Sequence, residues 1–125
     1  MPEFNALAPD VQLAIADHAR AVEIGGPQLG RPPVGTLSNS KHRNMKELRP
    51  TVNKVEWRVA FAFDPNGEAV LLVAGAKSGV KQTLFYKRLI NIADDRFSEW
   101  IAPILGAKMQ APTKKHPPSK KKKRK

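Results

Sequence analysis

The chain of 125 residues contains no cysteine, so disulfide scaffolds, thiolate nucleophiles and thiolate metal sites are excluded. It also lacks any run of about 20 apolar residues, the length that a membrane-spanning helix requires. Acidic residues are few: 11 Asp and Glu stand against 22 Lys and Arg, which gives a formal net charge of +11. Because Met1–Glu3 begins no signal peptide, we expect a cytoplasmic protein without a membrane segment.

Most of the positive charge lies at the C-terminal end. Residues 108–125 contain no acidic residue and very few apolar ones, so burial cannot offset the entropy of ordering them. We therefore expect a single domain over residues 1–107, followed by a disordered Lys-rich tail. The basic residues of this tail are Lys108, Lys114, Lys115, Lys120, Lys121, Lys122, Lys123, Arg124 and Lys125.

Charge is also segregated within the domain. Residues 3–24 contain four acidic residues and one arginine, whereas residues 41–58 contain six basic residues and two acidic ones. If folding brings the basic segments together, they form a face suited to a polyanion such as nucleic acid. The alternative is that these charges are dispersed over an ordinary solvated surface. The candidates for RNA contact on such a face are Lys41, His42, Arg43, Lys81, Lys87 and Arg88.

The hydrophobic pattern predicts an α+β fold. Apolar residues recur at helical spacing between Pro9 and the Gly25–Gly26 pair, which predicts an amphipathic helix. Residues 29–40 contain two glycines and two prolines, and they predict a loop with a short extended segment near its end. Residues 45–49 predict the start of a strand that Pro50 interrupts.

The clearest pattern is that of a β-hairpin. Residues 55–63 (VEWRVAFAF) place Val, Trp and Phe on one face of a strand, in alternation with Glu, Arg and Ala. Residues 64–67 predict the turn, and the apolar run at 69–74 predicts a central strand. Apolar residues between positions 85 and 101 then recur at helical spacing, and we expect this helix to end at Pro103.

No metal or cofactor motif accompanies these elements. The three histidines, His18, His42 and His116, lie in the first helix, a loop and the tail, without a second ligand at metal-binding spacing. The glycines between positions 75 and 79 lack the GxxxxGK[ST] spacing of a phosphate-binding loop. We therefore expect a protein that uses neither a metal nor a cofactor.

Strand alternation gives the basic residues a candidate chemistry. Arg58 lies on the strand face opposite Trp57, so we expect it to point outward from the core, and Tyr86 can reach the same side. A cationic cluster can hold a phosphate while a 2′-hydroxyl attacks it, which cleaves RNA without a metal. Nearby positive charge would also favour the ionised form of the tyrosine. The cations expected to converge there are Arg58, Lys46, Arg49 and either Lys77 or Lys81.

Each of these residues also has a purely structural alternative. Arg58 can pair across the sheet with Glu56 or Glu47, and Tyr86 can bury its ring against Phe85. Lys87 and Arg88 can form a solvated helix face, and His42 can be a solvent-exposed loop histidine.

Four segments together resemble a known family. Their order and spacing are similar to those of the phage-derived, HigB-like branch of the RelE/ParE toxin superfamily, over about residues 3–100. The resemblance implies a RelE-like fold, in which an N-terminal helix or helical hairpin packs on a small antiparallel sheet with a C-terminal helix. It also implies a toxin that cleaves mRNA, often on the ribosome, and that an antitoxin with a helix-turn-helix neutralises. The segments are KHRNMKELR (41–49), VEWRVAFAFD (55–64), LLVAGAKSG (71–79) and LFYKRLINIADDRF (84–97).

The resemblance also implies roles for individual residues. Arg58 matches the sheet arginine that holds the scissile phosphate in RelE-like nucleases, and Tyr86 matches a tyrosine implicated in proton transfer. Lys46 and Arg49 match the basic strand that precedes the strand of Arg58, and Lys77 matches the basic residue after the last strand. These five residues form the expected catalytic set.

The sequence departs from this family in three places. Family members usually have a β-strand before the first helix, so we expect either that the start of this sequence is misplaced or that the sheet lacks its N-terminal edge strand. Ala76 stands where similar sequences often carry an acidic residue, which changes the surroundings of the neighbouring basic groups. The Lys-rich tail lies outside the shared region and can add nonspecific affinity for nucleic acid by counterion release.

Two other functions stay open at the level of sequence. ParE-like relatives inhibit DNA gyrase and need no nuclease residues, because a fold does not fix a function. The second alternative is a non-enzymatic nucleic-acid-binding protein whose tail supplies most of the affinity.

Overall fold

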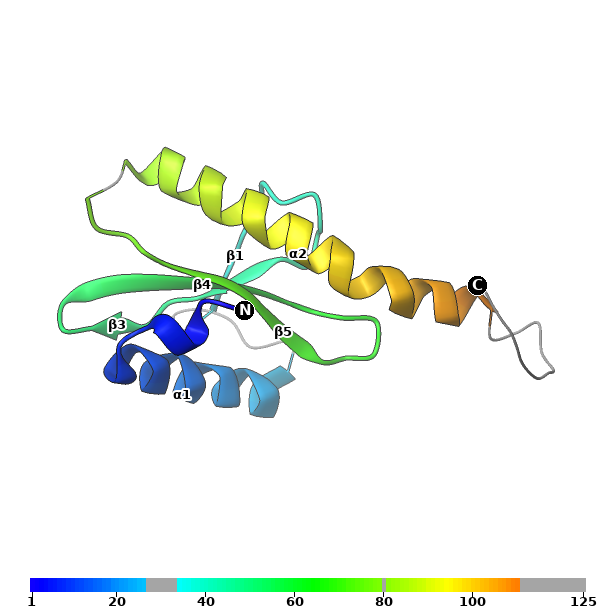
Figure 1. The fold of residues 1–125 in the computed structure, drawn as a ribbon, viewed down its shortest axis with the longest axis horizontal. Helices are drawn as coiled ribbons and strands as arrows, with labels where there is room; N and C mark the ends of the chain where they lie inside the picture. The colour runs from blue at the N-terminus through cyan, green and yellow to red at the C-terminus, as the bar shows by residue number, and fades with distance from the viewer. Residues whose placement is uncertain (27–33, 80, 111–125) are drawn as a thin grey trace.

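The computed structural model describes residues 1–26, 34–79 and 81–110, and it confirms the α+β class (Figure 1). A short 3₁₀ helix precedes the first α-helix, and five strands and a long second helix follow. The elements are η1 (Phe4–Ala6), α1 (Pro9–Gly25), β1 (Val34–Thr36), β2 (Lys46–Leu48), β3 (Thr51–Val52), β4 (Val55–Phe63), β5 (Ala69–Ala76) and α2 (Gln82–Gln110).

Strand β4 is the centre of an antiparallel sheet. Strands β2 and β3 pair with different parts of one edge of β4, β1 pairs with β2, and β5 pairs with the other edge of β4. Asn53 and Lys54 have φ values of 50° and 67° at the tight turn between β3 and β4, the positive values that two-residue hairpin turns require. The predicted hairpin of β4 and β5 is confirmed, and Asp64 stabilises its turn by accepting the N–H groups of Asn66 and Glu68.

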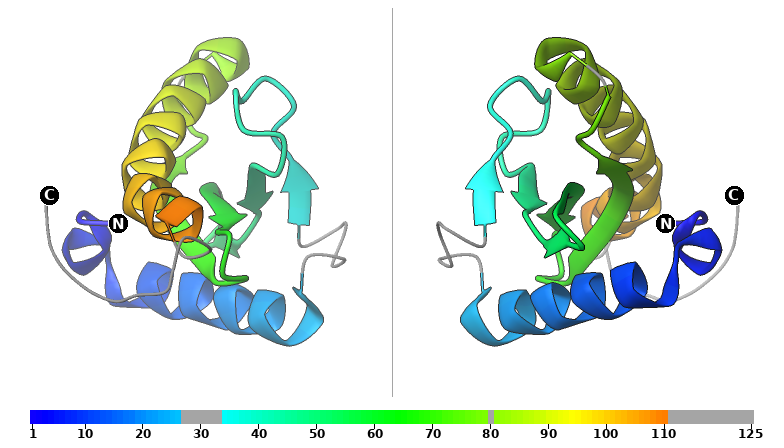
Figure 2. Two further views of the ribbon diagram at one scale, coloured as in Figure 1. Left: turned by 90° about the vertical axis from the view of Figure 1, so that its right-hand side faces the viewer. Right: turned by 90° about the vertical axis from the view of Figure 1, so that its left-hand side faces the viewer.

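The sheet is covered on both faces, with α1 along one face and α2 along the other (Figure 2). Side chains at the odd positions of β4, Val59 and Phe61, pack with Ile15 and Val22 of α1 and are inaccessible to solvent or nearly so. Both residues of α1 come from its apolar stripe, as the helical spacing predicts.

The even positions of β4 form the second half of the core. Ala60 and Ala62 are fully buried beneath Phe85 and Leu89 of α2. Because these alanines are small, α2 can approach the sheet closely and cover this face too. The expectation that the even face of β4, with Arg58 on it, turns outward from the core is therefore wrong.

Helix α2 is longer than its sequence pattern indicates. It continues through Pro103 to Gln110, whereas the expected end was at the proline. A proline inside a helix removes one hydrogen bond but leaves the remaining bonds of the flanking turns intact. The predicted domain boundary at residue 107 remains a prediction, and the predicted disorder of the tail concerns residues that lie mostly outside the described ones. No helix in the described part of the chain has the length and apolarity needed to cross a membrane.

Residues 1–26 contain no strand, so the outer edge of β5 carries no neighbouring strand within the described residues. Two side chains form hydrogen bonds with backbone groups of β5. Glu3 accepts the N–H of Ala74 at 3.2 Å, and Arg96 of α2 donates to the carbonyl of Leu72 at 2.6 Å. Glu3 and Arg96 also form an ion pair at 2.9 Å. An ion pair thus replaces two of the backbone hydrogen bonds that an edge strand would make.

Candidate functional site

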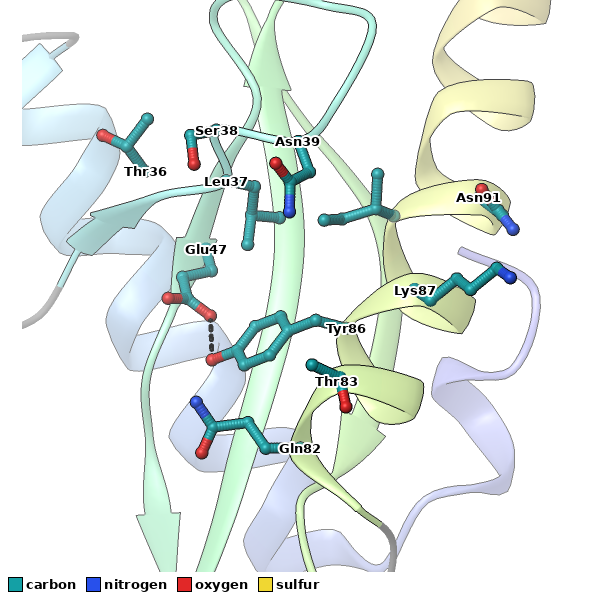
Figure 3. A pocket seen from close by; sticks show the side chains of 11 residues that line it. Thr36, Leu37, Ser38, Asn39, Glu47, Gln82, Thr83, Tyr86, Lys87 and Asn91 are labelled. Carbon is teal, nitrogen blue, oxygen red and sulfur yellow. Dashed lines mark hydrogen bonds between the residues drawn. The ribbon is translucent and has the colours of Figure 1, made fainter.

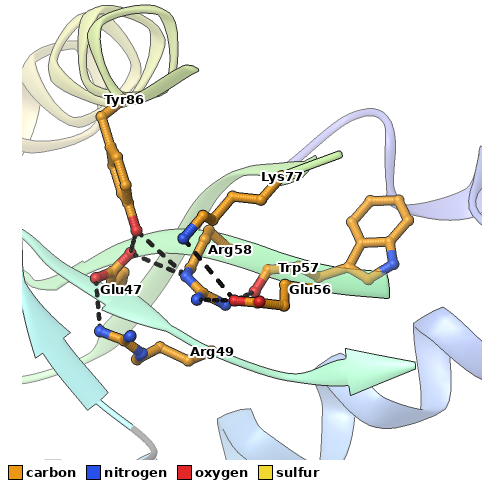
Figure 4. Close-up of polar contacts among 7 residues, drawn as sticks. All are labelled: Glu47, Arg49, Glu56, Trp57, Arg58, Lys77 and Tyr86. Carbon is orange, nitrogen blue, oxygen red and sulfur yellow. Dashed lines mark hydrogen bonds and ion pairs between the residues drawn. The ribbon is translucent and has the colours of Figure 1, made fainter. Parts of the chain in front are cut away.

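Polar side chains from four elements meet beneath the first turns of α2 (Figure 4). Glu47 comes from β2, Arg58 from β4, Tyr86 from α2, and Lys77 follows β5. Figure 4 shows Tyr86 reaching from α2 toward the carboxylate of Glu47 and the guanidinium of Arg58. We call Glu47, Arg49, Glu56, Arg58, Lys77 and Tyr86 the Arg58 cluster.

Arg58 is the buried centre of this cluster. Only 4% of its side chain is exposed, and its Nη2 lies 2.6 Å from Oε1 of Glu56. Its Nη1 donates to the carbonyl of Trp57 at 2.8 Å, and its Nε donates to the hydroxyl of Tyr86 at 3.2 Å. Nε also lies 3.7 Å from Oε1 of Glu47. Both proposed pairings of Arg58, with Glu56 and with Glu47, therefore occur together.

Tyr86 links Arg58 to a buried carboxylate. Its hydroxyl donates to Oε1 of Glu47 at 2.8 Å while it accepts from Arg58. Its ring also meets the ring of Phe85 edge to face, with centroids 5.3 Å apart. Burial, and then the hydrogen bond to Glu47, raise the pKa of Tyr86 above 10.0, and Arg58 offsets this only in part. The expectation that neighbouring cations favour the tyrosinate is wrong, and the phenol of Tyr86 stays protonated at neutral pH.

Two glycines make room for these side chains. Gly75 pairs with Arg58 across β4 and β5, and a Cβ there would lie 3.1 Å from the ring of Phe85. The missing side chain lets the start of α2 settle onto the sheet. Gly35 of β1 pairs with Glu47, and a Cβ there would lie 2.9 Å from its Oε2 and 3.2 Å from Nη1 of Arg49. Gly35 therefore leaves space for the pair of Glu47 and Arg49, whose atoms are 3.3 Å apart.

Glu56 lies between two cations at the open side of the Arg58 cluster. Its Oε1 is 2.6 Å from Arg58 and 3.8 Å from Nζ of Lys77. Lys77 is 20% exposed and also lies 5.7 Å above the ring of Tyr86, whereas the side chain of Glu56 is 56% exposed. The carboxylate of Glu56 thus occupies a position with the contacts that an oxygen of a bound phosphate would make.

Two of the expected cations do not join the cluster. Lys46 pairs with Phe61, whose side chain belongs to the face that α1 covers, so alternation along β2 places Lys46 on the sheet face opposite Glu47. Lys81 is exposed just before α2 begins. The structure therefore brings together Arg49, Arg58, Lys77 and Tyr86 from the predicted set, so Lys77 fills the place for which Lys77 and Lys81 were alternatives, and it leaves Lys46 on the opposite face.

The basic loop at residues 41–43 lies farther along α2. His42 is half-buried: its Nε2 lies 3.0 Å from the hydroxyl of Ser98, and its ring meets that of Phe97 edge to face. Ser98 is 12 residues after Tyr86, or about 18 Å along the helix axis. His42 is thus a packing residue remote from the cluster, and the idea that it is an exposed loop histidine is wrong. The RNA-contact candidates that are exposed are Lys41, Arg43, Lys81, Lys87 and Arg88.

Sequence reasoning had missed the two carboxylates as functional residues, since it considered them only as structural partners of Arg58. The available signal was their position on the strand face that carries Arg58: Glu56 two residues before it, and Glu47 on the neighbouring strand. Within residues 1–26, 34–79 and 81–110, no three His, Asp or Glu side chains are grouped as a metal site would need.

Comparison with known proteins identifies the family. The family model described as "Phage derived protein Gp49-like (DUF891)" matches residues 2–98. In Mycobacterium tuberculosis (strain ATCC 25618 / H37Rv), the protein named "Putative toxin HigB3" is 40% identical over 99 residues, which are 79% of this chain and 84% of that protein. The protein named "Putative toxin HigB2" is 40% identical over 100 residues, which are 79% of this chain and 49% of that protein. No solved structure matches the chain.

The matched region contains the whole Arg58 cluster, both glycines beside it and most of α2. The two relatives carry the name of the branch that the four sequence segments resemble, which confirms that resemblance. The chain therefore belongs to the phage-derived Gp49-like family and is similar to its HigB members.

Proposed function

We propose that this protein is the toxin of a type II toxin–antitoxin module and that it cleaves mRNA on the ribosome without a metal. The family and the names of the relatives support the toxin assignment. The observation that carries the nuclease assignment is the contact of Arg58 with Tyr86, next to Glu47 and Lys77. In this proposal the protein acts in the cytoplasm and is neutralised by a helix-turn-helix antitoxin.

The cluster contains the groups that an internal phosphoryl transfer needs. The 2′-oxygen of the RNA forms a bond to the adjacent phosphorus, and the bond from phosphorus to the 5′-oxygen of the next nucleotide breaks. Arg58 and Lys77 stabilise the negative charge that develops on the non-bridging oxygens. The products are a 2′,3′-cyclic phosphate and a 5′-hydroxyl, so no water, oxidant or cofactor is consumed.

Glu47 and Tyr86 divide the two proton transfers in this proposal. Glu47 takes the proton of the attacking 2′-hydroxyl, because a carboxylate is an acceptor at neutral pH. Tyr86 gives its proton to the departing 5′-oxygen, since its raised pKa keeps the phenol protonated. The hydrogen bond of 2.8 Å between them then returns the proton from Glu47 to Tyr86 and restores the starting state.

The direct test is inducible expression of the full chain, with mapping of transcript ends and of growth. Arg58→Ala and Tyr86→Phe should each lower mRNA cleavage at least a hundredfold and relieve growth inhibition. Arg20→Ala is the matched control, because Arg20 is exposed on α1, which covers the other face of the sheet, and it should behave like the wild type. Unchanged cleavage in both cluster variants would refute the nuclease mechanism.

The same expression system, with one further variant, separates the other two functions. Intact transcripts together with accumulating DNA breaks would indicate a gyrase inhibitor. Deletion of residues 111–125 tests the tail, because a nuclease keeps cleaving without it, whereas a tail-driven binder loses most of its affinity and its steep salt dependence.

A further inference from the structure

A polar pocket lies directly beside Tyr86, between the loop that follows β1 and the first turns of α2 (Figure 3). Its volume is about 480 Å³, within the range of about 300–1,000 Å³ that is typical of small-molecule sites. Glu47 and Tyr86 contribute to its lining, so it opens onto the Arg58 cluster. Nothing in the proposed cleavage chemistry uses the rest of this pocket.

The lining of the pocket suits a flat ring with polar edges. Leu37 and Ile90 supply apolar surface and Tyr86 supplies an aromatic ring, which can lie against the face of a planar ligand. Asn39 and Gln82 supply exposed side-chain amides, each of which both donates and accepts hydrogen bonds. In the view of Figure 3, the two amides lie on opposite sides of the Tyr86 ring.

The charges of the pocket argue against an anion as its occupant. Its charged residues are Glu47 and Lys87, and Figure 3 shows Lys87 pointing away from the phenol of Tyr86. Glu47 therefore faces the interior of the pocket, whereas Lys87 points outward. A phosphate would be repelled by Glu47, whereas a neutral ring with an amino group would offer that carboxylate a hydrogen-bond donor.

We infer that this pocket receives one unstacked nucleobase of the RNA whose phosphate the Arg58 cluster holds, and that it favours bases with an exocyclic amino group. This inference rests on the proposed function and adds the substrate contact that sets base preference. Asn and Gln side chains commonly read adenine edges, and a carboxylate accepts from the amino group of cytosine. Uracil has no amino group, so it should be the base that binds least well.

The first test is a direct titration of the full-length protein, observed by NMR. Cytidine 5′-monophosphate and uridine 5′-monophosphate form a matched pair, in which an amino group replaces a carbonyl oxygen. The cytidine nucleotide should bind at least fivefold more tightly and should shift the signals of Asn39 and Gln82. Asn39→Ala/Gln82→Ala should weaken its binding at least fivefold. Asn5→Ala, an exposed asparagine of η1, is the control and should bind as the wild type does.

The second test maps the bases next to the cleavage sites in cellular transcripts. The double variant should still cleave, more slowly and with a flatter base distribution, whereas Asn5→Ala should keep the wild-type distribution. Cleavage with an unchanged distribution, or equal binding of the two nucleotides, would overturn the inference and leave the nuclease proposal intact. If the protein binds cytidine 5′-monophosphate preferentially at the pocket but cleaves no RNA, the nuclease proposal is overturned. The role of the pocket in RNA cleavage is then overturned with it.

Discussion

Oε1 of Glu56 lies 2.6 Å from Nη2 of Arg58, so the arginine that would hold a phosphate is already paired with an acid of its own strand. The two partners differ greatly in exposure, because 56% of the Glu56 side chain is accessible and only 4% of that of Arg58. An incoming phosphate can therefore displace Glu56 by rotating it into solvent, while Arg58 stays in place. In the proposed mechanism, Glu56 would therefore compete with the substrate for Arg58.

The first prediction concerns this competition. Glu56→Gln should raise the affinity for RNA by about tenfold, because a hydrogen bond to a charged group contributes about 1.5–3 kcal/mol and part of that is recovered elsewhere. Binding of a non-cleavable RNA with 2′-deoxy substitution at the cleavage site measures the effect. Glu99→Gln, an exposed acid of α2, removes the same charge and is the control. An affinity below that of the control would show that Glu56 supports substrate binding instead.

The second prediction uses the fact that Tyr86 is the one tyrosine of the chain. Because burial and Glu47 raise its pKa above 10.0, the absorbance of tyrosinate should appear with a midpoint above that value. The folded-state pKa exceeds the unfolded one, so this group's contribution to stability is complete below about pH 10 and is lost as pH rises through the folded pKa. Glu47→Gln should move the midpoint down. A midpoint below that of free tyrosine would contradict the assignment of Tyr86 as the acid.

The third prediction tests the space that Gly35 leaves for Glu47. In Gly35→Ala, the new Cβ would lie 2.9 Å from Oε2 of Glu47, so this flexible carboxylate has to move away from its place beside Tyr86. We expect a tenfold or larger drop in the cleavage rate, since displaced catalytic groups affect the chemical step most. Gly106→Ala is the control, because a Cβ at Gly106 meets no atom within 4 Å. Equal cleavage rates in both variants would argue against Glu47 as the base.

The fourth prediction concerns the ion pair at the edge of β5. Burial opposes it, but hydrogen bonds from backbone N–H groups and from Arg96 lower the pKa of Glu3 below 4.5. Its contribution to stability is therefore present above that unfolded value and is lost as pH falls through the folded pKa. At pH 7, Glu3→Gln should lower the free energy of unfolding by about 1 kcal/mol, as judged by urea denaturation.

The difference between Glu3→Gln and wild type should shrink as the pH approaches 3. Glu23→Gln, an exposed acid of α1, should show no such dependence. A difference that stays constant from pH 7 to pH 3 would mean that the charge of Glu3 does not stabilise the edge of β5.

The strands and helices follow closely from the sequence, because short-range pattern determines them. The alternation in residues 55–63 and the spacing from Val11 to Val22 each reflect the face that becomes buried, and both elements form where they are predicted. The continuation of α2 past Pro103 could not be predicted this way. A proline weakens a helix at one position, and local patterns do not indicate whether the following turns form nevertheless.

The candidate site was predictable only in part. Alternation placed Arg58 correctly on the even face of β4, but burial of that face depends on α2 packing against Ala60 and Ala62. That contact is tertiary and leaves no periodic signal in the strand itself. The same contact reverses the expected effect on Tyr86, since burial beside Glu47 outweighs the nearby cations. The face on which Lys46 lies depends on the register between β2 and β4, which pairs Lys46 with Phe61. That register is not visible in the sequence of β2 alone.

The length of α2 sets the geometry for the Lys-rich sequence that follows it. Gln110 lies 24 residues beyond Tyr86, which corresponds to about 36 Å along a helix. The end of α2 is therefore separated from the phenol of Tyr86 by more than the diameter of an RNA duplex. If the protein cleaves RNA as proposed, α2 acts as a spacer between these two regions. Changes in the charge of the Lys-rich sequence would then alter how long an RNA stays bound without altering the cleavage step at the Arg58 cluster.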